Sequence, residues 1–297
     1  MLLVGFLSIL HGCGGSSGTT SADNNGTSGT NGMISGMAIK GPVSGATVTA
    51  YSIANGMMGS QVTNTTTDST GSFLLSMGTY SGSVMLQMSG GTYVDEATGM
   101  PMTMASGNVM TAVIPSVVSG STITGIQMTP LTSMSQSMAS NMAGGMTGAN
   151  IVAANASVGA YFMVNDILHT QPMNPLVSGS SGTATQDMKN YGMTIAAMSQ
   201  TAKDMGMTSS SGMVTAMMND ATDGVMNGMM GGTLISMGGM GGGMMGGGGA
   251  MMQVTAGTSG LATAMSAFMA SPMNKSGLTA ADMLTLMTHL NASNGTL

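Results

Sequence analysis

The sequence predicts an α+β protein with two domains, an N-terminal β-sandwich followed by an irregular all-α helical region. Three observations support this prediction. The 297 residues allow two small domains at about 100–200 residues each. From residue 33 to about residue 115, short segments alternate apolar and polar residues, which is the period of half-buried strands. From residue 127 to residue 297, apolar residues recur three and four positions apart, which is the helical period.

The chain begins with the features of an export signal. Leu2–Leu10 is an apolar stretch that is too short to span a bilayer as a helix. Cys13, the only cysteine, follows it with Leu three positions and Gly one position before. An unpaired thiol would be open to oxidation in an exported chain, which favours a modified cysteine. The arrangement resembles the lipobox of bacterial lipoproteins. It implies that residues 1–12 are a signal peptide and that Cys13 is acylated and anchors the chain to a membrane.

Residues 13–32 are predicted to form a flexible tether. Gly14–Gly32 consists almost entirely of Gly, Ser, Thr and Asn and has nothing to bury. A tether of this length would let the folded part stand away from the lipid surface. The residue after Cys13 is Gly instead of the Asp that favours inner-membrane retention in enterobacterial lipoproteins. We therefore expect a lipid-anchored protein of the bacterial cell envelope, in the outer membrane.

The region from residue 33 to residue 115 is expected to form the sandwich. Ala46–Tyr51 alternates Ala or Val with Thr or Tyr, as a half-buried strand does. Gly41–Val48 reads GPVSGATV, and Thr67–Phe73 reads TDSTGSF. These two stretches resemble the carboxypeptidase regulatory-like module, a transthyretin-type Greek-key sandwich. The resemblance covers about residues 34–90 and implies a non-catalytic adhesive or spacer module.

Three acidic residues are predicted to lie in turns of this module. Asp68 can cap its turn with the carboxylate, Gly71 suits a positive φ, and Phe73 then returns to the core. Asp95 and Glu96 are adjacent, so on a strand they would point to opposite faces. They are poor candidates for a paired general acid and base, and we expect them in a solvated turn.

The region 127–297 is predicted to be a Met-rich helical domain. Thr129 is a suitable N-cap and Pro130 a suitable first helical residue. Met134, Met138 and Met142 then form one apolar stripe. Five further helices are expected over residues 151–168, 185–205, 212–219, 261–270 and 279–290.

The charge content argues against several classes of function. Charged residues make up 5% of the chain, and the formal net charge is −6. The four lysines are isolated from one another, so no nucleic acid partner is expected. After removal of residues 1–12, only His169 and His289 remain with Cys13, too few for a structural Cys/His zinc site. Asn219–Asn227 is rich in oxygen ligands but lacks the register of a calcium loop, so a helix cap at Asp220 is the simpler interpretation.

The most unusual feature is methionine, which occurs 41 times. Within the Gly/Met-rich loop 223–253, closely spaced thioethers could bind a soft ion such as Cu(I) or Ag(I). Exposed methionines could also absorb oxidants as sulfoxides, and those at helical spacings could simply replace Leu. Low-complexity drift is a further explanation of the loop, because methionine is enriched throughout the chain. The candidate metal ligands are Met226, Met229, Met230, Met237, Met240, Met244 and Met245.

No nucleophile, base and orienting group can be assembled from these sparse titratable residues. The sequence therefore predicts a non-enzymatic cell-surface lipoprotein with a structural or binding role, whose ligand and protein partner it does not identify. The alternative prediction is Cu(I) or Ag(I) sequestration, or oxidant scavenging, through the methionines of the loop.

Overall fold

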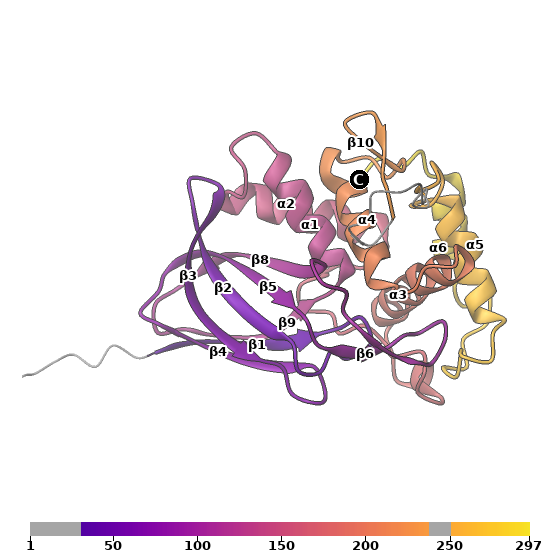
Figure 1. Cartoon of the computed structure of the whole chain (residues 1–297), viewed down its shortest axis with the longest axis horizontal. Helices are drawn as coiled ribbons and strands as arrows, with labels where there is room; N and C mark the ends of the chain where they lie inside the picture. Colours follow the sequence, from indigo (N-terminus) through magenta and orange to yellow (C-terminus); the bar gives the residue numbers. More distant parts are fainter. Residues whose placement is uncertain (1–30, 238–250) are drawn as a thin grey trace, which may run out of the picture.

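Two β-sheets and a group of helices occupy opposite halves of the molecule, as the computed structural model shows (Figure 1). The structure describes residues 31–237 and 251–297. It has both sheets and helices, so the mixed α+β class predicted from the sequence is confirmed.

The two larger sheets enclose a shared apolar core. One has the strand order β4-β1-β9, and the other has the order β3-β2-β5-β8. Side chains of both sheets, including Ile34, Leu75, Val48 and Leu86, are fully buried together. A small hairpin, β6-β7, projects from this sandwich toward the helices. The strands are β1 Gly32–Ala38, β2 Thr47–Ala54, β3 Met57–Thr66, β4 Ser72–Gly78, β5 Gly82–Ser89, β6 Thr92–Val94, β7 Pro101–Thr103, β8 Val109–Val117 and β9 Thr122–Met128.

The local patterns of the sandwich match their sequence predictions. Ala46, Val48 and Ala50 are fully buried, as the alternation predicts. Oδ1 of Asp68 accepts hydrogen bonds from the backbone N–H of Thr70 at 2.8 Å and from that of Ser72 at 3.0 Å, so Asp68 does cap its turn.

The strands continue beyond residue 115. After β8 the chain turns back and places β9 parallel to β1, with Met33 opposite Thr122 and Ala38 opposite Met128. This last strand completes the three-stranded sheet and leads directly into the first helix. The end of the sandwich and the start of the helices are therefore joined without a linker.

The first helix begins where the sequence predicts. Thr129 is the N-cap of α1, and Thr132 completes a capping box by accepting a hydrogen bond from the backbone of Thr129 at 2.8 Å. The helices are α1 Pro130–Asn141, α2 Gly148–Tyr161, α3 Gln186–Asp204, α4 Ser211–Asp220, α5 Ser259–Met269 and α6 Leu284–Ala292. None of the helices in the described part of the chain is both long and apolar enough to cross a bilayer.

Three local features depart from the predicted helical pattern. The helix expected to reach residue 168 ends at Tyr161, because Met163 adopts a left-handed φ of 54°. The last helix starts five residues late, since the carboxylate of Asp282 accepts hydrogen bonds from Thr279 and holds a turn there. A short hairpin of β10 (Met229–Met230) and β11 (Thr233–Leu234) means that the region is not purely helical.

The two halves share their interior. Met85 and Val113 of the sandwich pack with Ala139 of α1 and with Ile151 and Ala154 of α2. In the same way, Ile39 belongs to the helical core, whereas Leu168 and Val214 pack into the core of the sandwich. The sandwich is therefore not an isolated spacer but is packed against the helices.

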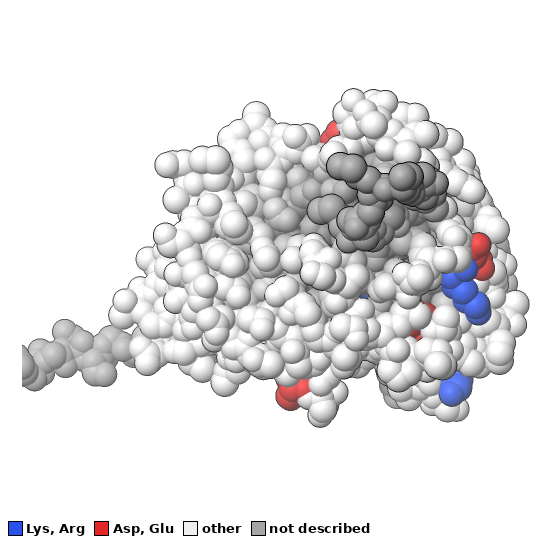
Figure 2. All heavy atoms as spheres, viewed as in Figure 1, with Lys and Arg blue, Asp and Glu red and all other residues white. Residues whose placement is uncertain are grey.

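The surface of the molecule is mostly uncharged on the face shown in Figure 2.

Candidate functional site

The β6-β7 hairpin brings residues of the sandwich onto the helices. The hydroxyl group of Tyr93 lies 3.1 Å from Ser210 Oγ and 3.3 Å from Ser209 Oγ, just before α4. Asn108, which follows β7, donates a hydrogen bond to Ser211 Oγ at 2.9 Å. These contacts fix β6 and the loop after β7 against the start of α4.

Beneath this hairpin lies a buried ionic cluster, which comprises Lys40, Asp95, Glu96, Ser199 and Ser210. Lys40 Nζ donates a hydrogen bond to Glu96 Oε2 at 2.7 Å and another to Ser199 Oγ, and it lies 3.8 Å from Asp95 Oδ2. Ser199 Oγ in turn donates to Glu96 Oε2 at 2.5 Å. Ser210 Oγ donates to Asp95 Oδ2 at 2.5 Å. The cluster therefore joins the turn after β1 and the turn of the hairpin to α3 and to the residue before α4.

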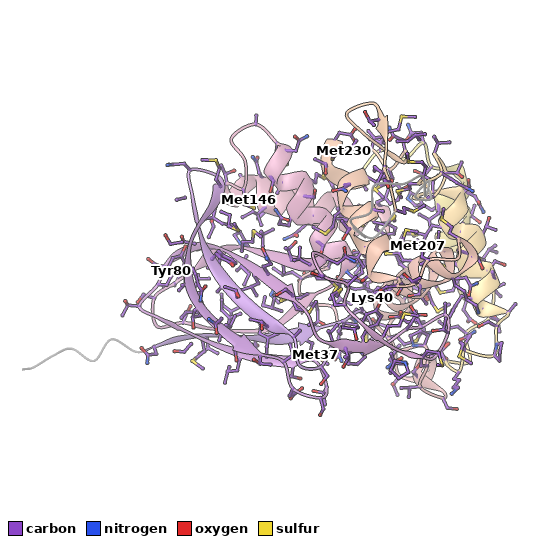
Figure 3. All side chains as sticks on the ribbon, in the orientation of Figure 1. Met37, Lys40, Tyr80, Met146, Met207 and Met230 are labelled. Atoms are coloured by element: carbon purple, nitrogen blue, oxygen red, sulfur yellow. The ribbon has the colours of Figure 1, made fainter. Side chains whose placement is uncertain are left out.

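Lys40 is the centre of this cluster and is completely inaccessible to solvent. It lies between the two halves of the molecule (Figure 3). Burial alone would lower the pKa of the ammonium group, but the adjacent carboxylates of Glu96 and Asp95 outweigh it and raise the pKa above its ordinary value of 10.5. Lys40 therefore remains charged at neutral pH.

The expected solvated turn at Asp95 and Glu96 is wrong. Asp95 is 1% exposed and Glu96 is 3% exposed, and both carboxylates face Lys40. The chain leaves the strand after Val94, so the two side chains need not point to opposite faces. Oδ1 of Asp95 accepts hydrogen bonds from the backbone of Ala97 and Thr98, which closes the turn.

Sequence reasoning singled out Asp95 and Glu96 but missed Lys40, Ser199 and Ser210, although part of the signal for Lys40 was present. Ile34, Ala38 and Lys40 have the same parity along β1 and its continuation, and all three are fully buried. The period of two therefore places Lys40 on the inward face. No comparable local signal identifies Ser199, because it meets Glu96 across 103 positions of sequence.

The cluster lacks the chemistry of a serine hydrolase. Ser199 contacts a lysine, but that lysine has a raised pKa and is held as an ammonium by the carboxylates. A lysine that acts as a base must be neutral at neutral pH, and its pKa must therefore be lowered instead of raised. Ser199 is also only 1% exposed. The arrangement therefore fits a fixed ionic link and not an activated nucleophile.

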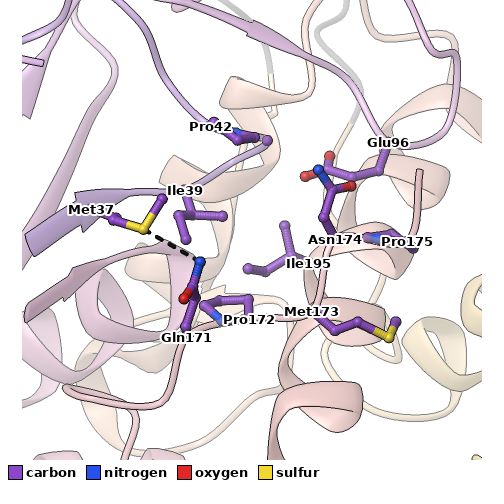
Figure 4. Close-up of a pocket in the computed structure, with 12 residues that line it drawn as sticks. Met37, Ile39, Pro42, Glu96, Gln171, Pro172, Met173, Asn174, Pro175 and Ile195 are labelled. Atoms are coloured by element: carbon purple, nitrogen blue, oxygen red, sulfur yellow. Dashed lines mark hydrogen bonds between the residues drawn. The ribbon is translucent and has the colours of Figure 1, made fainter. Parts of the chain in front are cut away.

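A pocket with a volume of about 130 Å³ adjoins this cluster (Figure 4). Its walls come from the end of β1 and the following turn, from the loop 171–175, from α3 and from Glu96. Glu96 and Asn174 lie at one end, and Met37 and Gln171 lie at the other, where Gln171 Nε2 donates to Met37 Sδ at 3.4 Å. The apolar lining consists mainly of Ile39, Pro42, Met173, Pro172, Pro175 and Ile195.

The walls of the pocket are held rigidly. Gly192 of α3 lies so close to the loop that a Cβ atom there would be 2.0 Å from Met173 O. A Cβ atom on Gly41 would likewise be 2.3 Å from Val94 O. Both glycines thus allow backbone segments to pack directly together. Prolines in the turn and in the loop further restrict the backbone, so the pocket exists before any ligand arrives.

The structure distributes the candidate metal ligands over different environments. Met226 and Met237 are buried in the helical core at 1% and 4% exposure, so glycine-rich surroundings do not keep them out of the core. Met229 is partly buried, and Met230 is 48% exposed on the β10-β11 hairpin. Met240, Met244 and Met245 lie outside the described residues. Cu(I) binding by this set stays a prediction.

The remaining residues singled out by sequence have mostly local roles. Cys13 lies outside the described residues. His169 is exposed and lies 2.8 Å from Asp166. Asp220 is buried at the end of α4, where its Oδ1 accepts the backbone N–H groups of Asn227 and Gly228. Among the described residues, no group of three or more His, Cys, Asp or Glu side chains could hold a metal ion.

The most distinctive polar arrangement is thus the ionic cluster with its adjoining pocket. Neither models of known protein families nor curated proteins give a match to this chain.

Proposed function

We propose that this chain is a non-enzymatic binding protein of the bacterial cell envelope, anchored by acyl chains on Cys13 in the outer membrane. In this proposal a Greek-key sandwich and a helical region dock through the ionic cluster and together form a small ligand pocket. The tether of residues 13–32 carries this body away from the lipid surface.

The observation that supports binding over catalysis is the state of Lys40. Its ammonium group is committed to Glu96 and Ser199, so Ser199 has no base in the cluster. The second carboxylate of the cluster, Asp95, is also fully engaged by Ser210 and by the turn. What stays open to a ligand is the pocket on the far side of Glu96.

Mass spectrometry of the protein extracted from membranes tests the anchor. We expect an N-terminal peptide that begins at Cys13 and carries acyl chains, and we expect Cys13→Ser to leave the protein without acyl chains. An unmodified Cys13 in the membrane fraction would contradict the proposed anchor.

A fluorophosphonate probe, which labels activated serines, tests the absence of catalysis. We expect no labelling of Ser199. Labelling that disappears in the Ser199→Ala variant would show an activated serine and would overturn the non-enzymatic assignment.

A further inference from the structure

The carboxylate of Glu96 uses only one of its two oxygens within the protein. Both hydrogen bonds to this side chain, from Lys40 and from Ser199, end on Oε2. No donor among residues 31–237 and 251–297 reaches Oε1, although the side chain is only 4% exposed. Because Glu96 lines the pocket, this free oxygen is available to a ligand there.

The formal charge of the cluster favours a cation in the pocket. One lysine faces two carboxylates, which leaves a formal charge of −1 when all three groups are ionised. Two further lysines lie near this region, since Lys203 donates to Ala97 O at 3.0 Å and the backbone N–H of Lys275 donates to Pro175 O at 2.9 Å. Both are exposed, so solvent screens their charges. A ligand ammonium group would complete the charge balance of a largely buried site.

The rest of the pocket suits a short aliphatic chain. Ile39, Pro42, Pro172 and Ile195 provide apolar contacts on several sides. A volume of about 130 Å³ corresponds to roughly ten water molecules, since a single water needs about 10–15 Å³, so the pocket has room for a short chain of several non-hydrogen atoms.

We propose that this pocket binds a small aliphatic primary amine, with the ammonium group on Oε1 of Glu96 and the alkyl chain against Ile39, Pro42 and Ile195. The proposal rests on the proposed binding function and names the ligand class of its pocket. The same chemistry is present in a free alkylamine and in the side chain of a lysine on a peptide.

Saturation-transfer NMR on the purified full chain tests this proposal with n-butylammonium as the probe. The neutral n-butanol and the anionic butyrate serve as controls of matched size. We expect n-butylammonium to bind at least about tenfold more tightly than n-butanol, and we expect no binding of butyrate. An acetylated peptide with a single lysine then distinguishes a peptide ligand from a free amine.

Two variants locate the bound amine. Glu96→Gln keeps the shape of the side chain but removes its charge, and it should lose the preference for n-butylammonium over n-butanol. Because this variant also alters the partner of Lys40, its fold is checked by circular dichroism. Asn174→Lys leaves the residues of the ionic cluster unchanged and places an ammonium group at the Glu96 end of the pocket. It should weaken amine binding about tenfold, whereas the neutral Asn174→Gln should not.

Equal binding of n-butylammonium and n-butanol would overturn the proposal, as would an absence of binding by both. Unchanged amine binding in Asn174→Lys would also overturn it, because the amine would then lie elsewhere. The acylation of Cys13 is measured on the same sample. A failure of amine binding therefore remains distinguishable from a failure of the proposed lipid anchor.

Discussion

Two turns of the sandwich have almost the same local chemistry but opposite environments. In one, Asp68 accepts hydrogen bonds from the backbone and the hydroxyl group of Thr70. In the other, Asp95 accepts hydrogen bonds from the backbone and the hydroxyl group of Thr98. Asp68 is exposed, whereas Asp95 is 1% exposed and lies beside Lys40. The comparison shows that local sequence specifies the turn, while distant residues decide whether its carboxylate meets water or protein.

The largest effect is expected from removal of the cation that only the buried turn possesses. Lys40→Met leaves Asp95 and Glu96 without their partner, and loss of one member of a buried ion pair typically costs about 3–5 kcal/mol. Denaturant unfolding measures this loss. The matched control is the exposed Lys275→Met, which should change the free energy of unfolding by less than about 0.5 kcal/mol. Similar losses in both variants would contradict the account of the cluster.

Substitution of either aspartate should lower the free energy of unfolding by less than Lys40→Met does, and the two losses should differ. Asp95→Asn weakens hydrogen bonds of a buried charged group, for which about 1.5–3 kcal/mol is typical. Asp68→Asn affects a solvated turn, where water replaces part of the lost interaction, so its effect on unfolding should be distinctly smaller. If Asp68→Asn were the more destabilising substitution, the contrast between the turns would be wrong.

These turns also show where sequence reasoning succeeds and where it stops. The cap by Asp68 and the start of α1 at Thr129 depend on residues within four positions, so the printed sequence predicts both. The burial of Glu96 depends on Ser199, which is 103 positions away. Its pairing also depends on β1, which brings Lys40 to the same place. The periodicity of a short sequence segment does not indicate such contacts between residues that are distant along the chain.

The same limit applies to the methionines of the loop. Glycine neighbours predict a flexible backbone for Met226 and Met237, yet both pack into the helical core. They are held there by tertiary contacts that override the local composition. For example, the backbone N–H of Met226 donates to Gly295 O at 2.7 Å, near the end of the chain.

A third carboxylate extends the comparison to pH. Burial raises the pKa of Asp220 to about 6, whereas hydrogen bonds from Thr70 and Ser72 lower the pKa of Asp68. The native state holds the proton of Asp220 more tightly than the unfolded chain does, so its stabilising contribution is complete below the ordinary value of 3.8 and is lost as the pH rises through about 6. Asp68 has the opposite sign, because its contribution is lost as the pH falls below that ordinary value.

Unfolding at about pH 5 and about pH 7 separates these contributions. Asp220→Asn should reduce the loss of stability between the two conditions relative to the unsubstituted protein. Asp68→Asn should leave that difference unchanged, since its pKa lies below the whole interval. An unchanged pH dependence in Asp220→Asn would argue against the raised pKa.

The smallest expected effects are differences in the oxidation rate of methionines, which the structure divides into an exposed and a buried group. Met57 and Met230 are 66% and 48% exposed, whereas Met134 and Met198 are fully buried. Mild peroxide treatment followed by peptide mass spectrometry should convert the first pair to sulfoxide well before the second. Equal rates would indicate that the core opens faster than the reaction proceeds.

The predicted Cu(I) binding can be tested by comparing the more exposed candidate methionines with the buried ones. Met229→Leu with Met230→Leu should lower Cu(I) affinity in an anaerobic competition titration if the hairpin supplies ligands. Met226→Leu with Met237→Leu is the matched buried pair and should leave the affinity unchanged. Because Leu and Met have similar volumes, each buried substitution should cost less than about 1.5 kcal/mol. A titration unaffected by the hairpin pair would remove Met229 and Met230 from the candidate ligands.

The burial of Lys40 between the two halves can be measured directly by reductive methylation of the native full chain. We expect the exposed Lys203 and Lys275 to be methylated while Lys40 stays unmodified until the protein unfolds. Methylation of Lys40 at the rate of Lys203 and Lys275 in the folded protein would contradict the ionic cluster, and with it the pocket that Glu96 lines.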